Sequence, residues 1–197
     1  MDRLPALIIL VALLGCDEGK RKDGAEPPSR VNAAKTGVKQ AATTAAFCDV
    51  HAPSDDKAAA FRWPALEGGT VPPAANGWRW VNIWATWCKP CIEEMPRLQQ
   101  WQRKLAASGK QVELAFVSVD ETAEAVTAYR TQHPEVPAST RLAEPARSAE
   151  WFQQLGLQGD PPIPIHVFVS PTGRIRCARS GGVREQDFAL VEKLLSE

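Results

Sequence analysis

Hydrophobic and polar positions follow two different rhythms along the C-terminal two thirds of the chain. Short, largely apolar runs rich in β-branched and aromatic residues predict buried strands. These runs are residues 78–84, 112–119, 136–142, 165–169 and 174–179. Between them, apolar side chains recur every three or four positions, which predicts amphipathic helices. The predicted helices are residues 88–107, 121–133, 145–155 and 184–195.

Strands that alternate with helices predict an α/β domain with a central sheet covered by helices. The turn Pro-Thr-Gly at 171–173 and the Gly-Gly pair at 181–182 delimit the last strand, which predicts a C-terminal hairpin followed by a helix. A short strand and turn are expected at 61–70. Pro96 lies inside the first long helix and is expected to kink it, because proline removes one backbone hydrogen bond.

The first 16 residues differ from the rest of the chain. Arg3 precedes an apolar run at 4–14 that is too short to cross a bilayer and matches the length of a signal-peptide core. The run ends in Leu-Leu-Gly-Cys, which resembles the bacterial lipobox and implies lipidation of Cys16. An ordinary secretory peptide with a chance cysteine is the alternative. Both interpretations predict a protein outside the cytoplasm, and Asp17 resembles a signal for retention at the inner membrane.

Composition then divides the remainder into a tether and a folded domain. Residues 17–46 are rich in charged residues, Gly, Pro, Ala and Thr, which predicts a flexible tether with a reach of about 30 Å. Residues 47–197 are predicted to form the globular domain, which we expect to be a monomer. The 23 basic residues are balanced by 23 acidic ones with no basic block, so nothing indicates nucleic-acid binding.

The chemistry is concentrated at 84–91, which read Trp-Ala-Thr-Trp-Cys-Lys-Pro-Cys. A Cys-x-x-Cys between a strand and a helix is typical of a thioredoxin-like redox site. Cys88 would lie at the helix start, where free N–H groups and the helix dipole favour a thiolate, so we expect it to be the nucleophile. Cys91, one turn further in, would resolve the mixed disulfide. This pair would serve as the redox group, with no separate cofactor.

Half of a zinc site and a permanent disulfide are the alternative interpretations of this motif. Zinc needs about four ligands, usually from a second paired motif, and none is visible. A permanent disulfide rarely spans so short a loop at such a junction. The redox interpretation is therefore favoured and no metal is expected. Pro90 suits the first helical turn, and Lys89 adds positive charge beside the thiolate.

Two of the five cysteines, Cys48 and Cys177, have no role in the redox pair or the lipobox. A structural disulfide is tolerated in the cell envelope. Stray thiols near an active disulfide would invite exchange. We therefore predict that the two cysteines pair, with two separate buried thiols as the alternative.

Residues 81–91 and the Glu-Glu-Met-Pro that follows at 93–96 resemble envelope thioredoxin-like reductases of the TlpA and ResA type. Val-Ser-Val-Asp at 117–120, Ile-Pro at 163–164 and Gly-Arg-Ile at 173–175 extend this resemblance. It covers about 61–195 and implies a thioredoxin-like fold, a central mixed β-sheet flanked by helices with a C-terminal β-hairpin and helix.

The resemblance also implies roles for single residues. Pro164 looks like the cis-proline that lies beside the disulfide and offers backbone groups to an extended substrate, with Pro162 as the competing position. The residues expected to meet a substrate are Trp87, Lys89, Pro90, Ile163 and Pro164.

Glu94 matches a family glutamate three residues after Cys91, so a helix places the two side chains on neighbouring faces. A partly buried carboxylate there would shuttle the proton of Cys91 during resolution. The alternative is a solvated surface glutamate, which Glu93 is expected to be. Asn82 stands where cytoplasmic thioredoxins carry a buried aspartate. His166 is expected to be a plain strand residue, with a residue that adds positive charge near the site as the alternative.

The function implied by the resemblance is that of a membrane-tethered thiol–disulfide reductase facing the periplasm. It would take electrons from a membrane thiol transporter of the CcdA or DsbD type and reduce client disulfides in cytochrome c biogenesis (apocytochrome c) or copper-site assembly. An oxidase or isomerase of the DsbA kind stays open, because the motif does not fix the reduction potential. A chaperone that binds Cu(I) through its soft thiolates is the third possibility.

Overall fold

The computed structural model describes residues 43–68 and 77–197. The predicted signal peptide, with Cys16, and residues 17–42 of the predicted tether lie outside this part, as do residues 69–70 of the predicted turn. The described fold begins with helix α1 (Thr44–Phe47), so the last residues assigned to the tether belong to the domain. Thr44 is buried, and its hydroxyl donates to the Glu197 carboxylate at 2.9 Å, which ties this helix to the C-terminus.

All the predicted strands and helices are present, with bounds shifted by a few residues. The strands are β1 (Val50–His51), β2 (Leu66–Glu67), β3 (Trp78–Trp84), β4 (Val112–Ser118), β5 (Ser139–Leu142), β6 (Ile165–Val169) and β7 (Ile175–Ser180). The longer helices are α2 (Lys89–Ala107), α3 (Ala123–Gln132), α4 (Ser148–Gln154) and α5 (Phe188–Leu194). Short 3₁₀ turns are η1 (Asp55–Lys57), η2 (Pro145–Arg147) and η3 (Glu185–Asp187), and the last two begin the predicted helices at 145–155 and 184–195. The sequence did not predict α1 or β1.

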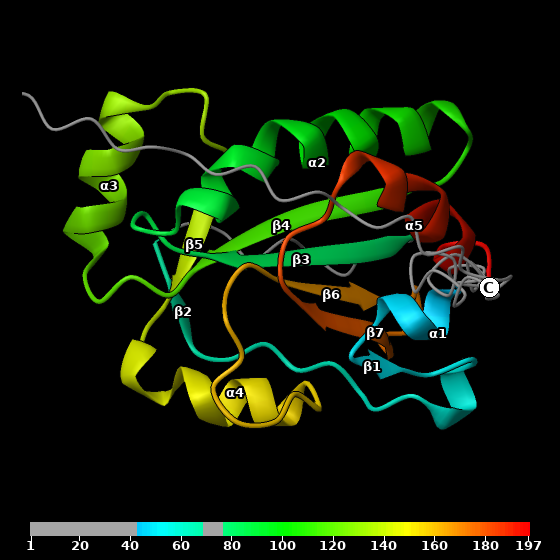
Figure 1. Cartoon of the computed structure of the whole chain (residues 1–197). Coiled ribbons are helices and arrows are strands. Elements are labelled where there is room, and N and C mark those ends of the chain that lie inside the picture. The colour runs from blue at the N-terminus through cyan, green and yellow to red at the C-terminus, as the bar shows by residue number, and fades with distance from the viewer. Residues whose placement is uncertain (1–42, 69–76) are drawn as a thin grey trace, which may run out of the picture. The chain divides into compact units, whose positions relative to one another are not determined.

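The seven strands form one mixed sheet in the order β1-β7-β6-β3-β4-β5-β2 (Figure 1). The central strands β3, β4 and β5 run parallel, whereas β6, β7 and the two short edge strands pair antiparallel. The β6–β7 hairpin and the helix α5 after it are the predicted C-terminal unit. The predicted thioredoxin-like fold, with helices flanking a mixed sheet, is confirmed.

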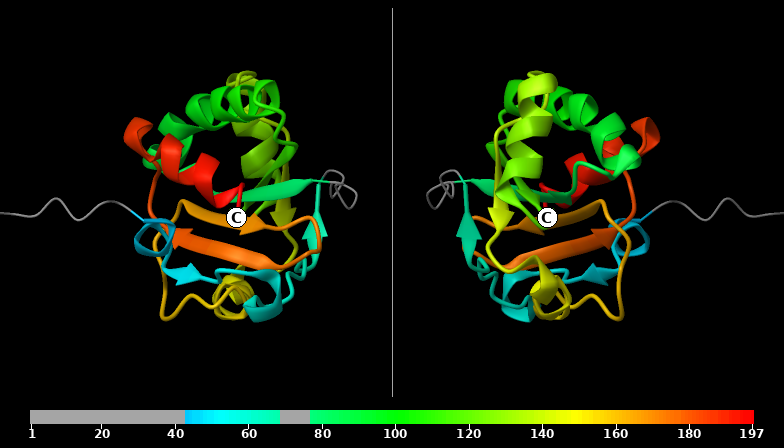
Figure 2. Two further views of the ribbon diagram at one scale, coloured as in Figure 1. Left: turned by 90° about the vertical axis from the view of Figure 1, so that its right-hand side faces the viewer. Right: turned by 90° about the vertical axis from the view of Figure 1, so that its left-hand side faces the viewer.

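Helices α2, α3 and α5 cover one face of the sheet and α4 covers the other (Figure 2). The alternation of side chains along β3 explains both layers, because successive residues of a strand point to opposite faces. Trp80 and Trp84 enter the hydrophobic cluster beneath α2, whereas Val81 and Ile83 enter the cluster that packs on α4. Both clusters are almost free of solvent, so each buried side chain contributes about 1.5–3 kcal/mol of apolar transfer free energy.

Two polar residues interrupt the apolar face beneath α2. Asn82 of β3 and His166 of β6 are directly opposite each other in the antiparallel register, and both are fully buried. Their strand neighbours Trp80 and Phe168 point to the same face. Their hydrogen-bond partners come from two sides: Glu94 of α2 accepts from Asn82, and Trp80 of β3 donates to His166.

The N-terminal part of the domain is fastened to β7. Cys48 and Cys177 form a disulfide with a Cα–Cα distance of 5.5 Å, as predicted. The buried Arg176 side chain donates to the carbonyl oxygens of Ala52 and Pro53 at 2.8 and 2.7 Å. These contacts hold β1 at the sheet edge although the strand has only two residues.

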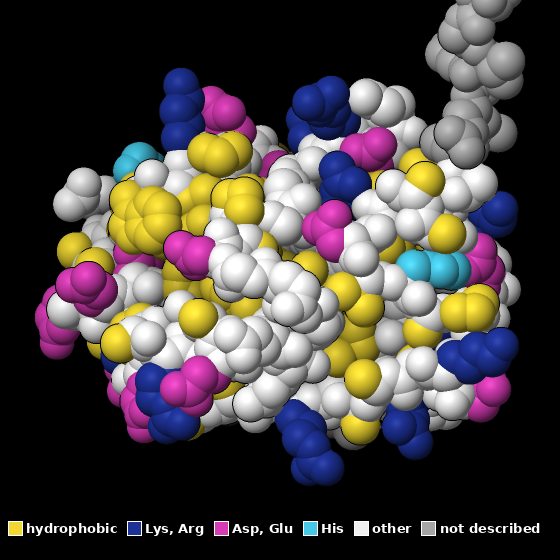
Figure 3. All heavy atoms as spheres, turned by 60° about the horizontal axis from the view of Figure 1, so that its bottom comes forward, with side chains coloured by type: hydrophobic (Ala, Val, Ile, Leu, Met, Phe, Trp, Pro, Cys, Tyr) yellow, Lys and Arg dark blue, Asp and Glu magenta, His cyan; other side chains and the backbone are white. Residues whose placement is uncertain are grey.

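Surface charge on the face drawn in Figure 3 is mixed, with Lys and Arg interspersed among Asp and Glu. Hydrophobic side chains gather toward the left of that view. Within residues 43–68 and 77–197, no helix has the length and apolar character that crossing a bilayer requires.

Candidate active site

Helix α2 begins directly at the Cys-x-x-Cys motif. Cys88 is its N-cap, and the Cys88 Sγ accepts the backbone N–H of Cys91 at 3.3 Å. Pro90 lies in the first turn, where no N–H is needed. The first turn contains no acidic residue, so a Cys88 thiolate would meet the free N–H groups at this end without a competing carboxylate from the turn itself.

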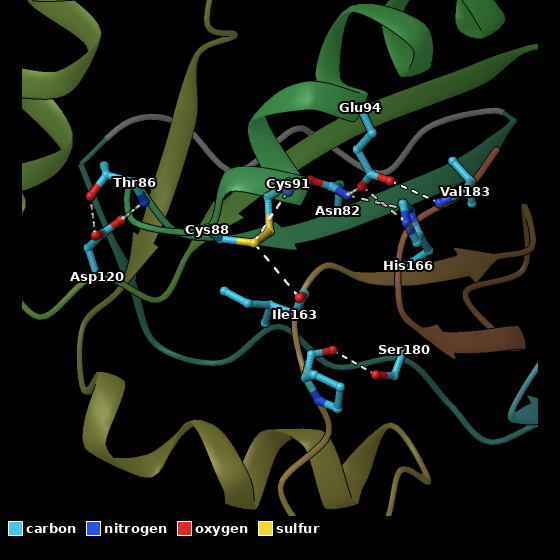
Figure 4. The surroundings of a disulfide bond; sticks show 11 residues. Asn82, Thr86, Cys88, Cys91, Glu94, Asp120, Ile163, His166, Ser180 and Val183 are labelled. Carbon is cyan, nitrogen blue, oxygen red and sulfur yellow. Dashed lines mark hydrogen bonds and ion pairs between the residues drawn. A yellow bond between two sulfur atoms is a disulfide. The ribbon is translucent and has the colours of Figure 1, made fainter. Parts of the chain in front are cut away.

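Cys88 and Cys91 form a disulfide with an S–S distance of 1.98 Å (Figure 4). Cys91 is completely buried, whereas Cys88 keeps 4% of its surface exposed. Cys88 is therefore the less shielded cysteine of the pair. This order agrees with the predicted division into an attacking and a resolving cysteine, whose catalytic roles stay predictions.

The peptide bond between Ile163 and Pro164 is cis, which settles the choice between Pro164 and Pro162. The Cys88 Sγ lies 3.8 Å from the Ile163 carbonyl oxygen. A disulfide sulfur carries no proton, so this is a van der Waals contact in the oxidised protein. Pro164 is buried and Ile163 is half-buried. The segment before β6 thus lies directly against the reactive sulfur.

The residues that flank the disulfide on the outside are exposed. Trp87 keeps 70% of its surface accessible, which is exceptional for a large apolar side chain in the described part of the chain. Lys89 and Pro90 are also exposed. The Lys89 ammonium lies 3.6 Å from the Glu93 carboxylate in a solvated pair, so its effect on the sulfur is screened. Glu93 is the surface glutamate that the sequence predicted.

The sequence predicted a partly buried carboxylate at Glu94, with a solvated one as the alternative. The structure shows that Glu94 is almost completely buried. Its Oε1 accepts from Asn82 Nδ2 at 3.0 Å, and its Oε2 accepts the backbone N–H of Val183 at 2.9 Å. Figure 4 shows the carboxylate directed from α2 toward β3 and the segment after β7. These two donors compensate part of the cost of removing a carboxylate from water.

His166 corrects the prediction of a plain strand residue. The ring is fully buried, its Nδ1 accepts from Trp80 Nε1 at 3.1 Å, and its Nε2 lies 3.2 Å from Glu94 Oε1. A histidine at the second position of the otherwise apolar run at 165–169 was the available signal. Asn82 gave the same signal within β3.

The sequence also missed the partnership of Thr86 with Asp120. Asp120 is buried just beyond β4, and its two carboxylate oxygens accept from the backbone N–H and the hydroxyl of Thr86. Asp120 belongs to the motif at 117–120 that supports the family resemblance, but no role was assigned to it. Within residues 43–68 and 77–197, no three His, Cys, Asp or Glu side chains are grouped to hold a metal ion.

Comparisons with known proteins agree with this geometry. A family model described as thioredoxin-like matches residues 79–175. The thiol-disulfide oxidoreductase ResA of Bacillus thuringiensis is 30% identical over 95 residues, which are 48% of this chain and 50% of that protein. The thioredoxin-like protein YneN of Bacillus subtilis is 39% identical over 49 residues, 25% of this chain and 29% of that protein. The chain thus spans half or less of the length of these two relatives.

Solved structures show the same fold. A putative thiol:disulfide interchange protein DsbE from Chlorobium tepidum superposes with a TM-score of 0.54 at 24% identity, covering 73% of this chain and 97% of that one. A thioredoxin-related protein from Neisseria meningitidis serogroup B gives a TM-score of 0.52 at 25% identity, covering 66% and 98%. Residues 79–175, which include the Cys-x-x-Cys motif and the cis-proline, are therefore part of a thioredoxin-like domain.

Proposed function

We propose that the chain is a thiol–disulfide oxidoreductase that exchanges electrons through Cys88 and Cys91. One observation carries the proposal: a disulfide caps the start of α2, and its outer sulfur touches the cis segment at Ile163. A disulfide that only stabilised the fold would not need an open surface beside it. Trp87 provides such a surface.

The exchange proceeds in two substitutions at sulfur. In the reduced protein the Cys88 thiolate attacks one sulfur of a client disulfide, forms a mixed disulfide and releases the other client sulfur as a thiolate. The Cys91 thiolate then attacks Cys88 Sγ, closes the internal disulfide and releases the second client thiolate. Two electrons pass to the client, and Cys91 gives up its proton in the second step.

Three features support individual steps. The free N–H groups at the start of α2 favour the Cys88 thiolate, both as nucleophile and as leaving group. The segment at 163–164 offers backbone groups to an extended client chain, and Trp87 adds apolar contact area. Glu94, one helical turn from Cys91 and buried, would accept the Cys91 proton.

We also propose that the protein reduces its clients and that it is located in the cell envelope. The apolar run at 4–14 with Cys16 supports a lipid anchor, and residues 17–42 would complete the tether. A membrane thiol transporter of the CcdA or DsbD type would supply electrons. Disulfides of apocytochrome c or of copper-site assembly proteins would be the clients.

Trapping of the mixed disulfide tests the exchange mechanism. The reduced Cys91→Ser variant should accumulate a covalent adduct with a disulfide-containing protein, visible on a non-reducing gel and removed by dithiothreitol. Cys88→Ser should form none, since the buried sulfur at 91 cannot attack. Equal trapping by both variants, or by neither, would overturn the proposed function. The same variants made on a Cys48→Ser/Cys177→Ser background exclude adducts at the structural pair.

Equilibration with glutathione buffers tests the direction. A potential near the thioredoxin value of about −270 mV supports a reductase, whereas one near the DsbA value of about −120 mV would reverse the assignment.

Mass spectrometry tests the anchor. Full-length protein extracted from bacterial membranes should carry a lipid mass on Cys16, and Cys16→Ala should lose both the mass and the membrane fraction. A mature protein that begins at a residue other than Cys16 and carries no lipid would contradict the proposed anchor.

A further inference from the structure

A buried polar cluster lies behind the disulfide, on the face of the sheet beneath α2. It consists of Trp80 and Asn82 from β3, His166 from β6 and Glu94 from α2 (Figure 4 shows the last three). The side chains of His166 and Glu94 are 0% and 3% exposed. Buried polar groups are costly unless they are paired, so the arrangement of donors and acceptors in this cluster fixes where its protons lie.

Trp80 determines which ring nitrogen of His166 carries the proton. The indole N–H is only a donor, so the His166 Nδ1 that receives it at 3.1 Å must be unprotonated. The Asn82 amide nitrogen, also a donor, lies 3.4 Å from the same Nδ1. The ring proton is therefore on Nε2. A proton on Nδ1 would set a second N–H against the Trp80 N–H inside a fully buried site.

The Nε2–H of this tautomer faces Glu94. The Nε2 lies 3.2 Å from Glu94 Oε1, although the contact is not aligned as a regular hydrogen bond. The same oxygen accepts from Asn82, and Oε2 accepts the Val183 N–H. The carboxylate is thus surrounded by donors from three separate elements.

Few other titratable groups reach this carboxylate in the described part of the chain. From α2 itself the neighbour is Cys91, one turn back. From β6 it is His166, and β3 offers only the neutral Asn82. The segment after β7 presents a backbone amide, and Arg97 of α2 is engaged with the Val183 carbonyl at 2.7 Å and with Glu185.

We propose that His166 is a positioning residue for Glu94. The ring, held by Trp80 in the Nε2–H tautomer, presents its N–H to the carboxylate and keeps the carboxylate directed toward the sheet. Glu94 is then the one group in the cluster that takes the proton when the Cys91 S–H bond breaks, and it later returns the proton to water. This inference rests on the proposed exchange function. It assigns to His166 an influence on the pH dependence of disulfide exchange.

Nitrogen NMR of the imidazole rings tests the tautomer without any activity measurement. In the wild-type protein at neutral pH, His166 should show a protonated Nε2 and a bare Nδ1, while His51 and His133 act as internal controls. His166→Gln assigns the signal. Trp80→Phe removes the donor to Nδ1 and should let the Nδ1–H tautomer appear. An Nδ1–H tautomer in the wild type would overturn the proposal.

The pH profile of disulfide exchange tests the positioning role. His166→Phe removes the Nε2–H that faces the carboxylate, so the bend that Glu94 produces in the pH profile should move. His166→Gln can accept from Trp80 and donate to Glu94, so it should restore the wild-type bend. If Glu94→Gln abolishes the bend and His166→Phe leaves it unmoved, the histidine only fills space.

The two arms separate the possible failures. Absence of exchange in the wild-type protein would refute the proposed function, whereas the NMR result concerns only the cluster. Far-ultraviolet circular dichroism and unfolding curves identify a variant that has not folded. If a variant has not folded, the NMR measurement of the His166 tautomer in the wild-type protein tests the proposal.

Discussion

The carboxylate of Asp120 accepts both the backbone N–H and the hydroxyl of Thr86, at 3.0 and 2.6 Å. Thr86 lies two residues before Cys88, and Asp120 lies two residues beyond the end of β4. The Ser118 hydroxyl adds a third hydrogen bond to the buried Asp120 carboxylate at 2.6 Å. The loop that presents the reactive sulfur is therefore fixed to the neighbouring parallel strand.

Removal of this anchor should affect both stability and exchange. Asp120→Ala leaves the Thr86 N–H without its acceptor, so we expect the free energy of unfolding to fall by about 1–3 kcal/mol. Exchange should slow by about tenfold for every 1.4 kcal/mol of lost positioning in the transition state. Urea unfolding of the oxidised protein and the rate of client reduction measure the two effects.

Asp120→Asn is the matched control for that experiment. An amide oxygen in the place of Oδ2 still accepts from Thr86 N–H and from Ser118, and the amide nitrogen can donate to the Thr86 hydroxyl after that hydroxyl rotates. The loss should therefore be smaller than in Asp120→Ala. Equal losses in the two variants would show that charge, rather than hydrogen bonding, holds the loop.

The Cys48–Cys177 disulfide should contribute to stability without taking part in exchange. It joins residues 129 positions apart, so the chain-entropy estimate of its contribution reaches about 5 kcal/mol. We expect Cys48→Ser/Cys177→Ser to lower the midpoint of urea unfolding markedly and to leave the trapping behaviour of Cys88 intact. If the folded double variant no longer traps the mixed disulfide at Cys88, the Cys48–Cys177 pair has a redox role instead.

Acid should weaken the contact between η1 and the β6–β7 turn. The Thr172 hydroxyl lowers the pKa of the Asp55 carboxyl below its usual 3.8; Ser170 and Arg176 add to this effect, and burial opposes it. A lowered folded-state pKa gives stability that is fully present above the unfolded pKa and is lost as the pH falls through the folded one. The stability advantage of wild type over Asp55→Asn should be constant above about pH 5 and shrink below about pH 4.

Chemical unfolding at a series of pH values measures this difference, with Asp56→Asn on the same turn as the exposed control. An advantage that grows toward low pH would have the opposite sign and would contradict the assignment.

Local patterns predicted much of this molecule, and long-range register decided the rest. The strands, the helices and the Cys88–Cys91 motif follow from periodicity and spacing within short stretches. The bridge between Cys48 and Cys177 followed from eliminating the other cysteines. By contrast, His166 reaches Glu94 only because β6 pairs with β3 so that residue 166 faces Asn82. No local signal encodes a register between strands that lie so far apart in the sequence.

The short elements were missed for a related reason. Helix α1 and strand β1 have four and two residues, too few for a periodic pattern. Tertiary contacts hold them instead, through the disulfide at Cys48 and the hydrogen bonds of Arg176. The burial of Glu94 was likewise unpredictable, because the segment that covers it is brought over α2 only by the C-terminal hairpin.

Gly182 of that segment lies between the carboxylate and the cis-proline. A Cβ atom at this position would be 3.1 Å from Glu94 Oε2 and 3.8 Å from Pro164 Cγ. The first distance is shorter than ordinary van der Waals contact, so Gly182→Ala must displace the carboxylate or the segment. We expect a loss of about 1–3 kcal/mol in the free energy of unfolding, which is typical of overpacking. The pH profile of exchange should change as well.

A double-mutant cycle with Glu94→Asp separates this clash from a general backbone effect. The shorter side chain withdraws the carboxylate from position 182, so the cost of Gly182→Ala should be smaller in the Glu94→Asp background. A coupling of about 0.5–3 kcal/mol, measured by urea unfolding, is the range for residues in contact. Additive losses would mean that alanine strains the backbone of the 181–183 segment and leaves Glu94 in place, and the exchange profile should then match that of the wild type.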